Sequence, residues 1–287
     1  MGSPASTVAS STLQVGFIGL GDQGGPMAVA IAEAGFALHV WARRPASLDT
    51  LGSAPHTAHP SAAALGAACD IVALCLTDDS DLVELLERGG MLDSLKQGAI
   101  VVNHGTGDPA ENRRMAARLA EAGIGFLDAP VSGGRPGAVA RTLTTIVGGD
   151  AATLARCREV FESYSRTIAL MGPAGSGQLG KLLNNALTMS NLDNAARVLA
   201  LASQLQLDVR AVTAMVSASS GGSAILNALP AFTPDLARHL QGLMKKDIDH
   251  FADGMCAAGL DPAEMHARSL HGAGALVEVV QRLQQGG

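Results

Sequence analysis

Aromatic and charged residues are scarce in this sequence, and it contains no dense run of basic side chains. Aromatic residues account for 3% and charged residues for 16% of the 287 positions, and the formal net charge is −6. Binding to nucleic acid or to an anionic membrane depends on clustered positive charge. We therefore expect no nucleic acid and no membrane as partner, whereas a small or anionic metabolite requires only a local basic pocket.

Cysteine is also scarce, and long apolar runs are missing. The four cysteines, Cys69, Cys75, Cys157 and Cys256, form no C-x-x-C pair, so we expect neither a zinc ribbon nor a disulfide framework. No apolar run approaches the roughly 20 residues of a membrane helix. Residues 1–12 lack the basic and apolar regions of a signal peptide and are expected to be a flexible segment. These features predict a soluble, cytoplasmic protein.

Short apolar segments alternate with helical segments between Leu13 and about Gly149. The segments expected to be strands are LQVGFIG, FALHVWA, DIVALCL, AIVVN, IGFLDAP, TLTTIVGG and, after them, RTIALMG. Strands that alternate with helices in this way form a parallel sheet with helices on both faces. The pattern predicts an α/β domain over residues 13–172.

After Gly172 the apolar spacing becomes helical. From Ser176 to about Leu207 it predicts one long helix, and shorter helical segments follow, separated by SASSGGS, LPAFTP and GLDP. No strand-like alternation returns. We expect an all-helical domain over residues 173–287 that begins with this long helix and packs against a partner subunit, because it is small.

A glycine motif follows the first expected strand. In VGFIGLGDQGGPMAVAIAEAG, Gly19, Gly21 and Gly24 form G-x-G-x-x-G directly before an amphipathic helix. The first glycine permits a tight turn, the second lets a pyrophosphate approach the main chain, and the third lets helix and strand pack closely. The helix N-terminus attracts the phosphates. In this context the motif indicates a Rossmann-type dinucleotide-binding domain and not an ordinary glycine-rich turn.

The end of the second expected strand indicates which dinucleotide is bound. NAD-binding domains usually carry Asp or Glu there to hold the ribose 2′-hydroxyl, but this chain has Ala42 followed by Arg43 and Arg44. Two guanidinium groups and no carboxylate favour a 2′-phosphate. We therefore expect NADP in preference to NAD, the alternative being that the arginines belong to a solvated loop.

Four motifs occur in a fixed order along the chain: GFIGLGDQGGPMA, DAPVSGG, GSGQLGKLLNN and LMKKDIDHF. The set resembles the β-hydroxyacid dehydrogenases, the family of 3-hydroxyisobutyrate dehydrogenase and tartronate semialdehyde reductase. The resemblance implies a Rossmann-type NAD(P) domain joined through a long helix to an all-α domain, and a homodimer or homotetramer. It also implies reversible oxidation of a small 3-hydroxy acid to its semialdehyde.

The same resemblance assigns substrate-site residues. Lys181, in GKLLNN, matches the catalytic lysine, and Asn185 matches the amide that helps to hold the substrate. DAPVSGG matches the loop that binds the substrate carboxylate, through Ser132, Gly133 and Gly134. A serine hydroxyl and exposed main-chain N–H groups are suitable donors to a carboxylate.

The cofactor site is assigned in the same way. Thr106, in NHGTGDP, matches the threonine beside the nicotinamide ribose, and Lys246 matches the lysine that closes over the cofactor from the helical domain. The residues expected to bind the cofactor are Gly19, Leu20, Gly21, Asp22, Gln23, Gly24, Arg43, Arg44, Leu76, Thr106 and Lys246.

The chemistry of the lysine also follows from its place in the sequence. Lys181 and Asn185 lie at i and i+4 of one expected helix, so both side chains reach the same face. A free lysine has a pKa of about 10.4, so a basic role near neutral pH needs burial or a nearby positive charge, which Lys246 could supply. The alternative is an ordinary surface lysine.

The segment around this lysine also comes close to a phosphate-binding loop. Gly175, Gly180 and Lys181 fit G-x-x-x-x-G-K-[ST], but Leu182 replaces the hydroxyl residue that would bind magnesium. The chain already has a phosphate cradle in its first glycine motif. We therefore interpret the lysine as a group that serves a carbonyl.

Several positions depart from the family pattern. Gln23 stands where the family usually has Met, and His104 and Arg141 stand where it has small residues. His104 could approach the nicotinamide or the substrate, or make only local hydrogen bonds. Arg135 or Arg141 could recognise a second acidic group or face solvent.

The segment KDIDHFAD raises the question of a metal, because it offers Asp247, Asp249, His250 and Asp253 as possible ligands. His250 and Asp253 could share a helix face, but Asp249 points elsewhere, and no H-E-x-x-H pattern is present. We expect a solvated helix face and no metal.

Two other functions remain open at this level. Imine reductases share the glycine motif and an arginine-bearing second strand, but usually lack the carboxylate loop and the catalytic lysine, both of which this chain keeps. A dehydrogenase-like module without turnover is the third hypothesis, which the intact Lys181, Asn185 and Ser132 disfavour.

Overall fold

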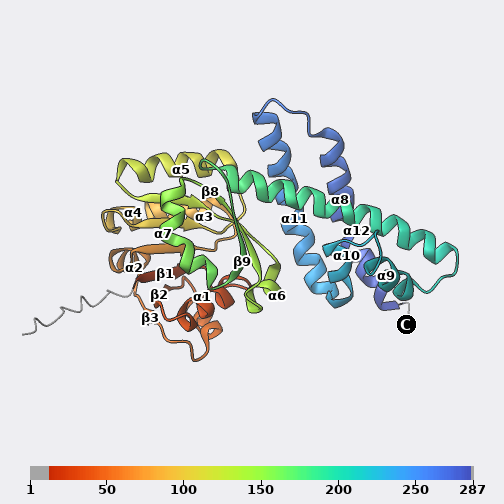
Figure 1. Ribbon diagram of the computed structural model, residues 1–287, viewed down its shortest axis with the longest axis horizontal. Coiled ribbons are helices and arrows are strands. Elements are labelled where there is room, and N and C mark those ends of the chain that lie inside the picture. The colour runs from red at the N-terminus through yellow and green to blue at the C-terminus, as the bar shows by residue number, and fades with distance from the viewer. Residues whose placement is uncertain (1–12, 286–287) are drawn as a thin grey trace, which may run out of the picture. The chain divides into compact units, whose positions relative to one another are not determined.

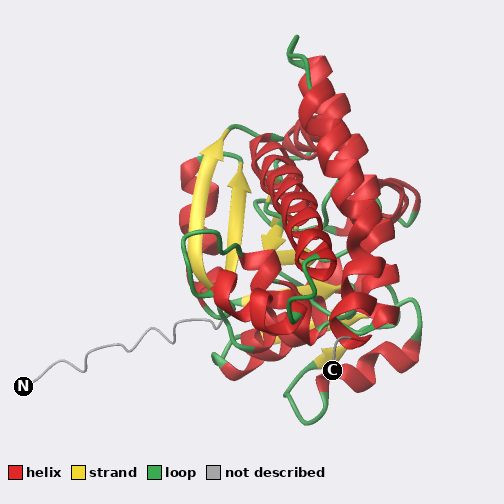
Figure 2. Cartoon of the chain, turned by 90° about the vertical axis from the view of Figure 1, so that its right-hand side faces the viewer, coloured by secondary structure: helices red, strands yellow, loops and turns green. Residues whose placement is uncertain are grey.

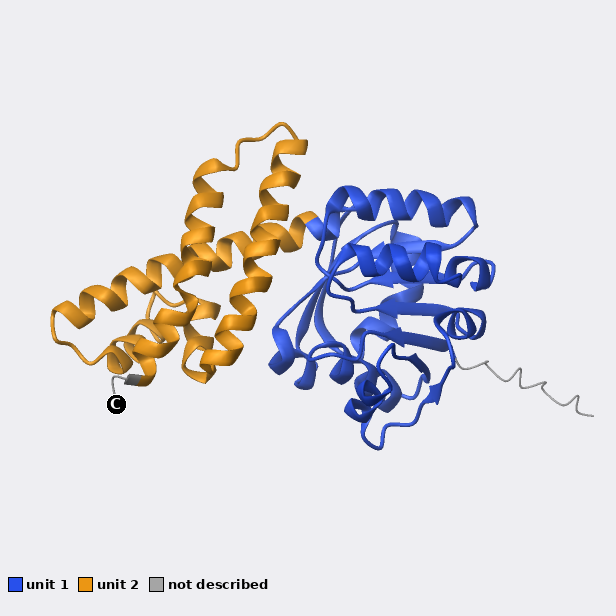
Figure 3. Cartoon of the chain, turned by 180° about the vertical axis from the view of Figure 1, so that it is seen from behind, with its two compact units in different colours: residues 1–178 blue, residues 179–287 orange. Residues whose placement is uncertain are grey.

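The computed structural model describes residues 13–285. The flexible segment expected over residues 1–12 lies outside the described residues. The chain divides into two compact units, Met1–Gln178 and Leu179–Gly287, drawn in blue and orange in Figure 3. Strands and helices make up the first unit, and helices the described part of the second.

The first unit is built on a nine-stranded sheet. Its strands are β1 (Gln14–Ile18), β2 (Ala37–Trp41), β3 (Thr57–Ala58), β4 (Ile71–Leu74), β5 (Ile100–Asn103), β6 (Gly125–Asp128), β7 (Val131–Ser132), β8 (Leu143–Gly148) and β9 (Ser165–Gly172). The order is β3-β2-β1-β4-β5-β6-β8-β7, and β9 pairs with β8. The chain crosses over between β1 and β4, so ligands of such sheets bind at the carboxyl ends of these two strands.

The expected parallel sheet is confirmed from β3 to β6, but β8 runs antiparallel to β6 and β7. The connection from β6 to β8 contains α6 (Gly134–Val139), which has only six residues and is about 9 Å long. A helix this short does not carry the chain back across the sheet for a parallel return, so β7 and β8 form a hairpin-like pair around it. The sequence pattern did not indicate these antiparallel pairs at the edge of the sheet.

Helices cover both faces of this sheet, as expected (Figure 1). One face packs against α1 and α7, and the other against α2, α3, α4 and α5. Adjacent residues of β4 show the division, because Ile71 and Ala73 join one apolar cluster while Val72 and Leu74 join the other. The helices are α1 (Gly24–Glu33), α2 (Ala62–Ala68), α3 (Asp79–Val83), α4 (Met91–Ser94), α5 (Pro109–Glu121) and α7 (Ala151–Glu162), with a 3-10 helix at Pro45–Leu51 and a π-helical turn at Glu84–Arg88.

The long helix expected from Ser176 is α8 (Ser176–Gln204), with 29 residues. It is followed by α9 (Val209–Ser217), α10 (Ala224–Ala228), a 3-10 turn (Leu229–Ala231), α11 (Pro234–Ala257) and α12 (Ala263–Gln285). The strands, yellow in Figure 2, end at Gly172, so the described part of the second unit is all-helical. In residues 13–285 no helix combines the length and apolar character needed to cross a membrane.

Side-chain caps explain where these helices begin. The Asp208, Ser223 and Thr233 side chains accept hydrogen bonds from main-chain N–H groups in the first turns of α9, α10 and α11. Caps of this kind satisfy donors that have no partner inside the helix. The breaks predicted at SASSGGS and LPAFTP therefore coincide with capping residues.

Candidate functional site

The glycine motif forms a main-chain cradle between β1 and α1. Gly19 has φ +98°, and a Cβ there would lie 2.1 Å from the Cys75 carbonyl oxygen at the end of β4. A Cβ on Gly24 would lie 1.9 Å from the Gly19 carbonyl oxygen, whereas one on Gly21 meets nothing within 4 Å. Two of the glycines are therefore required by the fold, and Gly21 leaves open space for a ligand.

The start of α1 fits the pyrophosphate of a dinucleotide. No side-chain hydrogen bond caps the helix at Gln23, and this N-terminus is the positive end of the helix dipole, which attracts phosphate. Asp22 is exposed and Gln23 half-buried. The Leu20 side chain is only 4% exposed and belongs to the core, so only its main chain can contact a cofactor.

The two arginines expected to select the cofactor lie directly after β2, and both are exposed. The Arg43 guanidinium lies 3.1 Å from an Asp81 carboxylate oxygen in α3, with the two side chains 72% and 26% exposed. The sequence does not indicate Asp81 as a neighbour of Arg43, because Asp81 lies in α3, 38 residues further along the chain. Its carboxylate accepts a hydrogen bond from the Arg43 guanidinium.

Leu76 and Thr106 follow β4 and β5, so they lie at the carboxyl ends of neighbouring strands in the centre of the sheet. Both residues are half-buried. A Cβ on Gly105 would lie 2.8 Å from the Leu76 carbonyl oxygen, which shows that the two loops are in main-chain contact. The structure thus brings Leu76 and the Thr106 loop together beside the glycine cradle.

The expected carboxylate loop begins at the end of β7. Ser132 is half-buried, and Gly133 and Gly134 have φ of +131° and +60°, conformations that favour glycine. Arg135 is exposed. Arg141 pairs with Glu33 at the surface, the arrangement expected of a solvent-facing role.

His104 makes only local hydrogen bonds in this structure. It is 3% exposed, its Nδ1 donates to the Ala129 carbonyl at 2.7 Å, and its Nε2 accepts from the Tyr164 hydroxyl at 3.1 Å. Burial lowers the pKa of His104 to about 4, so the ring is neutral. Of the two interpretations of His104, the structure favours the local one.

In the second unit, Lys181 and Asn185 share one face of α8 with a carboxylate from α11. The Asn185 Nδ2 donates to an Asp247 carboxylate oxygen at 2.8 Å, and both residues are buried. Burial lowers the pKa of Lys181, an effect that the Asp247 carboxylate opposes. Burial also raises the pKa of Asp247, against the influence of Lys246 and Lys181. Asp247 therefore contacts Asn185 directly and acts on Lys181 through its charge.

Sequence reasoning considered Asp247 only as a metal ligand. The sequence did contain a sign that Asp247 is unusual. Asp247 lies on the apolar face of α11 together with Ile248 and Phe251, where a solvated acid is not expected. Lys246 lies beside it, with its Nζ 3.6 Å from Asp247. Asp249 instead lies 3.1 Å from His266, and the described residues contain no group of three or more acidic, His or Cys side chains suited to a metal.

Comparison with known proteins identifies the family. A family model described as the NAD binding domain of 6-phosphogluconate dehydrogenase matches residues 14–172, and one described as NAD-binding of NADP-dependent 3-hydroxyisobutyrate dehydrogenase matches residues 175–280. The NAD-dependent L-serine dehydrogenase of Pseudomonas aeruginosa is 36% identical over 211 residues, 73% of this chain and 71% of that protein. The 2-hydroxy-3-oxopropionate reductase of Escherichia coli is 37% identical over 198 residues, 68% and 67% of the two chains.

A solved structure agrees with these relatives. The 3-hydroxyisobutyrate dehydrogenase of Mycobacterium tuberculosis, determined with L-serine, has a TM-score of 0.81 at 25% identity and covers 95% of this chain and 99% of its own. The resemblance inferred from the four motifs is thereby confirmed. This chain belongs to the β-hydroxyacid dehydrogenases, a family of NAD(P)-dependent oxidoreductases that act on hydroxy acids.

Proposed function

We propose that this chain interconverts a small 3-hydroxy acid and its semialdehyde with NADP(H), with Lys181 as general acid and base. The observation that carries the proposal is the Lys181, Asn185 and Asp247 group, which lies on the same two helices as the apolar cluster of Leu182 and Phe251. Ionisable side chains placed in apolar surroundings and coupled to one another are characteristic of catalytic sites.

The proposed role of the lysine follows from its two protonation states. A dinucleotide bound here would supply hydride to the carbonyl carbon in reduction and accept it from the hydroxyl-bearing carbon in oxidation. During reduction the Lys181 ammonium donates a proton to the developing alkoxide oxygen, and during oxidation the neutral amine accepts it. The lowered pKa makes the neutral form accessible closer to neutral pH than in a solvated lysine.

The proposed substrate contacts are hydrogen bonds to its oxygen atoms. The Asn185 amide is oriented by Asp247 and by Asn184, whose Nδ2 donates to the Asn185 Oδ1 at 3.1 Å. We assign to this amide a hydrogen bond to the substrate hydroxyl. The Ser132 hydroxyl and the main-chain N–H groups of Gly133 and Gly134 would bind its carboxylate.

The preference for NADP rests on the end of β2. Arg43 and Arg44 are exposed there, and the two positions after the strand hold no carboxylate for a ribose 2′-hydroxyl. A guanidinium binds phosphate in a bidentate manner. We expect a lower KM for NADPH than for NADH, and the reverse order would refute this assignment.

We also propose that the active form is a homodimer or homotetramer. Four apolar side chains along α8 are 46–57% exposed: Leu183, Leu187, Val198 and Leu201. Apolar side chains that line one long helix are commonly covered by a second subunit. Light scattering coupled to gel filtration should give a mass of at least twice 29.1 kDa, and a monomer at micromolar concentration would contradict the proposal.

The decisive test is a substrate panel with matched lysine variants. Short semialdehydes, 3-hydroxy acids and one cyclic imine are assayed by NADPH absorbance. Lys181→Ala should lower kcat for semialdehyde reduction by about a hundredfold or more while NADPH binding persists. Lys245→Ala, an exposed lysine on α11, is the control and should retain wild-type kinetics.

Each other outcome identifies a different function. Turnover of the imine alone would indicate an imine reductase. NADPH binding without turnover of any substrate would indicate a non-catalytic module. Undiminished semialdehyde reduction by Lys181→Ala would refute the role of this lysine.

A further inference from the structure

The first turn of α8 contains a buried glutamine whose side-chain amide forms hydrogen bonds with the loop that carries Thr106. Gln178 is 0% exposed. Its Oε1 accepts the Gly107 N–H at 3.0 Å, and its Nε2 donates to the Gly105 carbonyl at 2.9 Å. The two ends of one amide therefore fix the main chain on both sides of Thr106.

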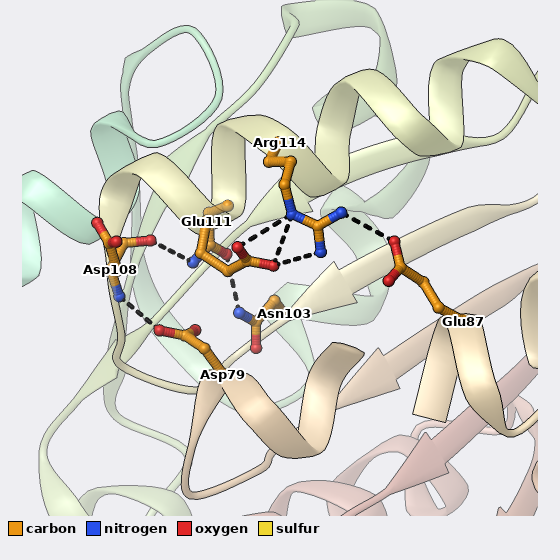
Figure 4. Close-up of polar contacts among 7 residues, drawn as sticks. Asp79, Glu87, Asn103, Asp108, Glu111 and Arg114 are labelled. Atoms are coloured by element: carbon orange, nitrogen blue, oxygen red, sulfur yellow. Dashed lines mark hydrogen bonds and ion pairs between the residues drawn. The ribbon is translucent and has the colours of Figure 1, made fainter. Parts of the chain in front are cut away.

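Other contacts hold the rest of the same loop. The Gly105 N–H donates to the Asn103 side chain at 3.0 Å. The Asp108 N–H donates to the Asp79 carboxylate at 2.7 Å (Figure 4). A Cβ on Gly107 would lie 2.1 Å from the Asp79 carboxylate. Four main-chain polar groups of the loop are thus bound by side chains from three elements of the first unit.

Gln178 is itself held at a fixed place. Its main-chain N–H donates to the Asp128 carboxylate at 2.8 Å, and the Gly175 N–H donates to the other oxygen of the same group at 2.7 Å. Asp128 is 0% exposed and lies at the end of β6. The carboxylate therefore caps α8 from the sheet, which leaves the Gln178 side chain little freedom to change its direction.

We propose that Gln178 is a positioning residue for the bound dinucleotide, which it orients through Thr106. The role requires a side chain that accepts at one end and donates at the other, because the loop presents an N–H on one side of Thr106 and a carbonyl on the other. The inference rests on the proposed function in one respect, because it takes Thr106 to lie beside the nicotinamide ribose of bound NADP(H), as the family resemblance implies.

The test is a titration of NADPH fluorescence with three variants, in the absence of any substrate. Gln178→Met keeps the side-chain length but removes both hydrogen bonds, and should raise the Kd for NADPH about tenfold. Gln178→Glu keeps an acceptor for Gly107 but places a carboxylate oxygen against the Gly105 carbonyl, and should weaken binding at least as much. Gln241→Met is the control, because this glutamine also donates to two main-chain carbonyls but lies in the second unit.

A double-mutant cycle separates positioning from a general loss of stability. If Gln178 acts through Thr106, then Gln178→Met should change the Kd less than about twofold when Thr106→Val is already present. Thermal unfolding of each variant reports the stability loss separately. An unchanged Kd in Gln178→Met, or effects of the two substitutions that multiply independently, would overturn the proposal. A wild-type protein that binds NADPH but reduces no semialdehyde would count only against the proposed substrate class.

Discussion

A pair of glycines on α12 allows a sharp test of how this helix packs. A Cβ on Gly272 would lie 1.9 Å from the Met189 carbonyl oxygen and 3.0 Å from the Asp193 main-chain nitrogen, so the two helix backbones are in direct contact. A Cβ on Gly274, two residues further along, meets nothing within 4 Å. The same substitution to alanine should therefore have opposite effects at the two positions.

At Gly272 a methyl group forces the helices apart, and overpacking of this kind costs about 1 to 3 kcal/mol. For a unit of about 100 residues this corresponds to a decrease in Tm of about 5 to 15 °C. At Gly274 alanine should raise the unfolding free energy by about 0.5 to 1 kcal/mol, because it restricts the unfolded chain and favours helix.

Differential scanning calorimetry of the wild type and the two variants measures both effects. The expected result is a lower transition temperature for Gly272→Ala and an equal or higher one for Gly274→Ala. Equal shifts of the same sign would refute the close approach of α12 to α8. Circular dichroism at 25 °C checks that each variant is folded before heating.

Three further predictions concern carboxylates. Burial raises the pKa of Asp193, but hydrogen bonds from Arg197 and His271 outweigh it and lower the pKa overall. The ionised carboxylate therefore stabilises the fold above about pH 4, and this stabilisation is lost as the pH falls through the folded-state pKa. Asp193→Asn should flatten this fall of the unfolding free energy at acid pH, as measured by urea titrations. Burial lowers the pKa of Lys181 and the Asp247 carboxylate partly opposes this, so Asp247→Asn should lower that pKa further. Semialdehyde reduction, which needs the protonated lysine, should then be lost at lower pH. A pH profile of kcat that does not move would contradict an interaction between the two groups. Asp81→Asn should lower the KM for NADPH about threefold by releasing Arg43 from an exposed ion pair, with no matching change for NADH.

The sequence predicted the fold where local periodicity and capping residues agree. All seven expected strands are present, and the long helix begins at the expected Ser176. The strands that were not expected, β3 and β7, have two residues each, too few to show an alternating pattern. They exist because a neighbouring strand is available to pair with them, which is a tertiary property.

The candidate site was predictable only where its residues are close in sequence. Lys181 and Asn185 are one helical turn apart, and the three cradle glycines span six positions of one motif. Asp247 reaches Asn185 across 62 residues, and Gln178 reaches Gly107 across 71. Contacts at such separations depend on how helices and loops meet in space, which no short pattern encodes.

The loop around Thr106 also limits how this enzyme can be altered. Side chains at Gly105 and Gly107 would collide with the Leu76 carbonyl and the Asp79 carboxylate, so variation there is blocked on both sides. A library randomised over residues 105–107 should therefore return folded, cofactor-binding clones that vary at the central position alone. Under the proposed assignment of Thr106 to the nicotinamide ribose, changes in how this loop contacts the dinucleotide are confined to a single codon.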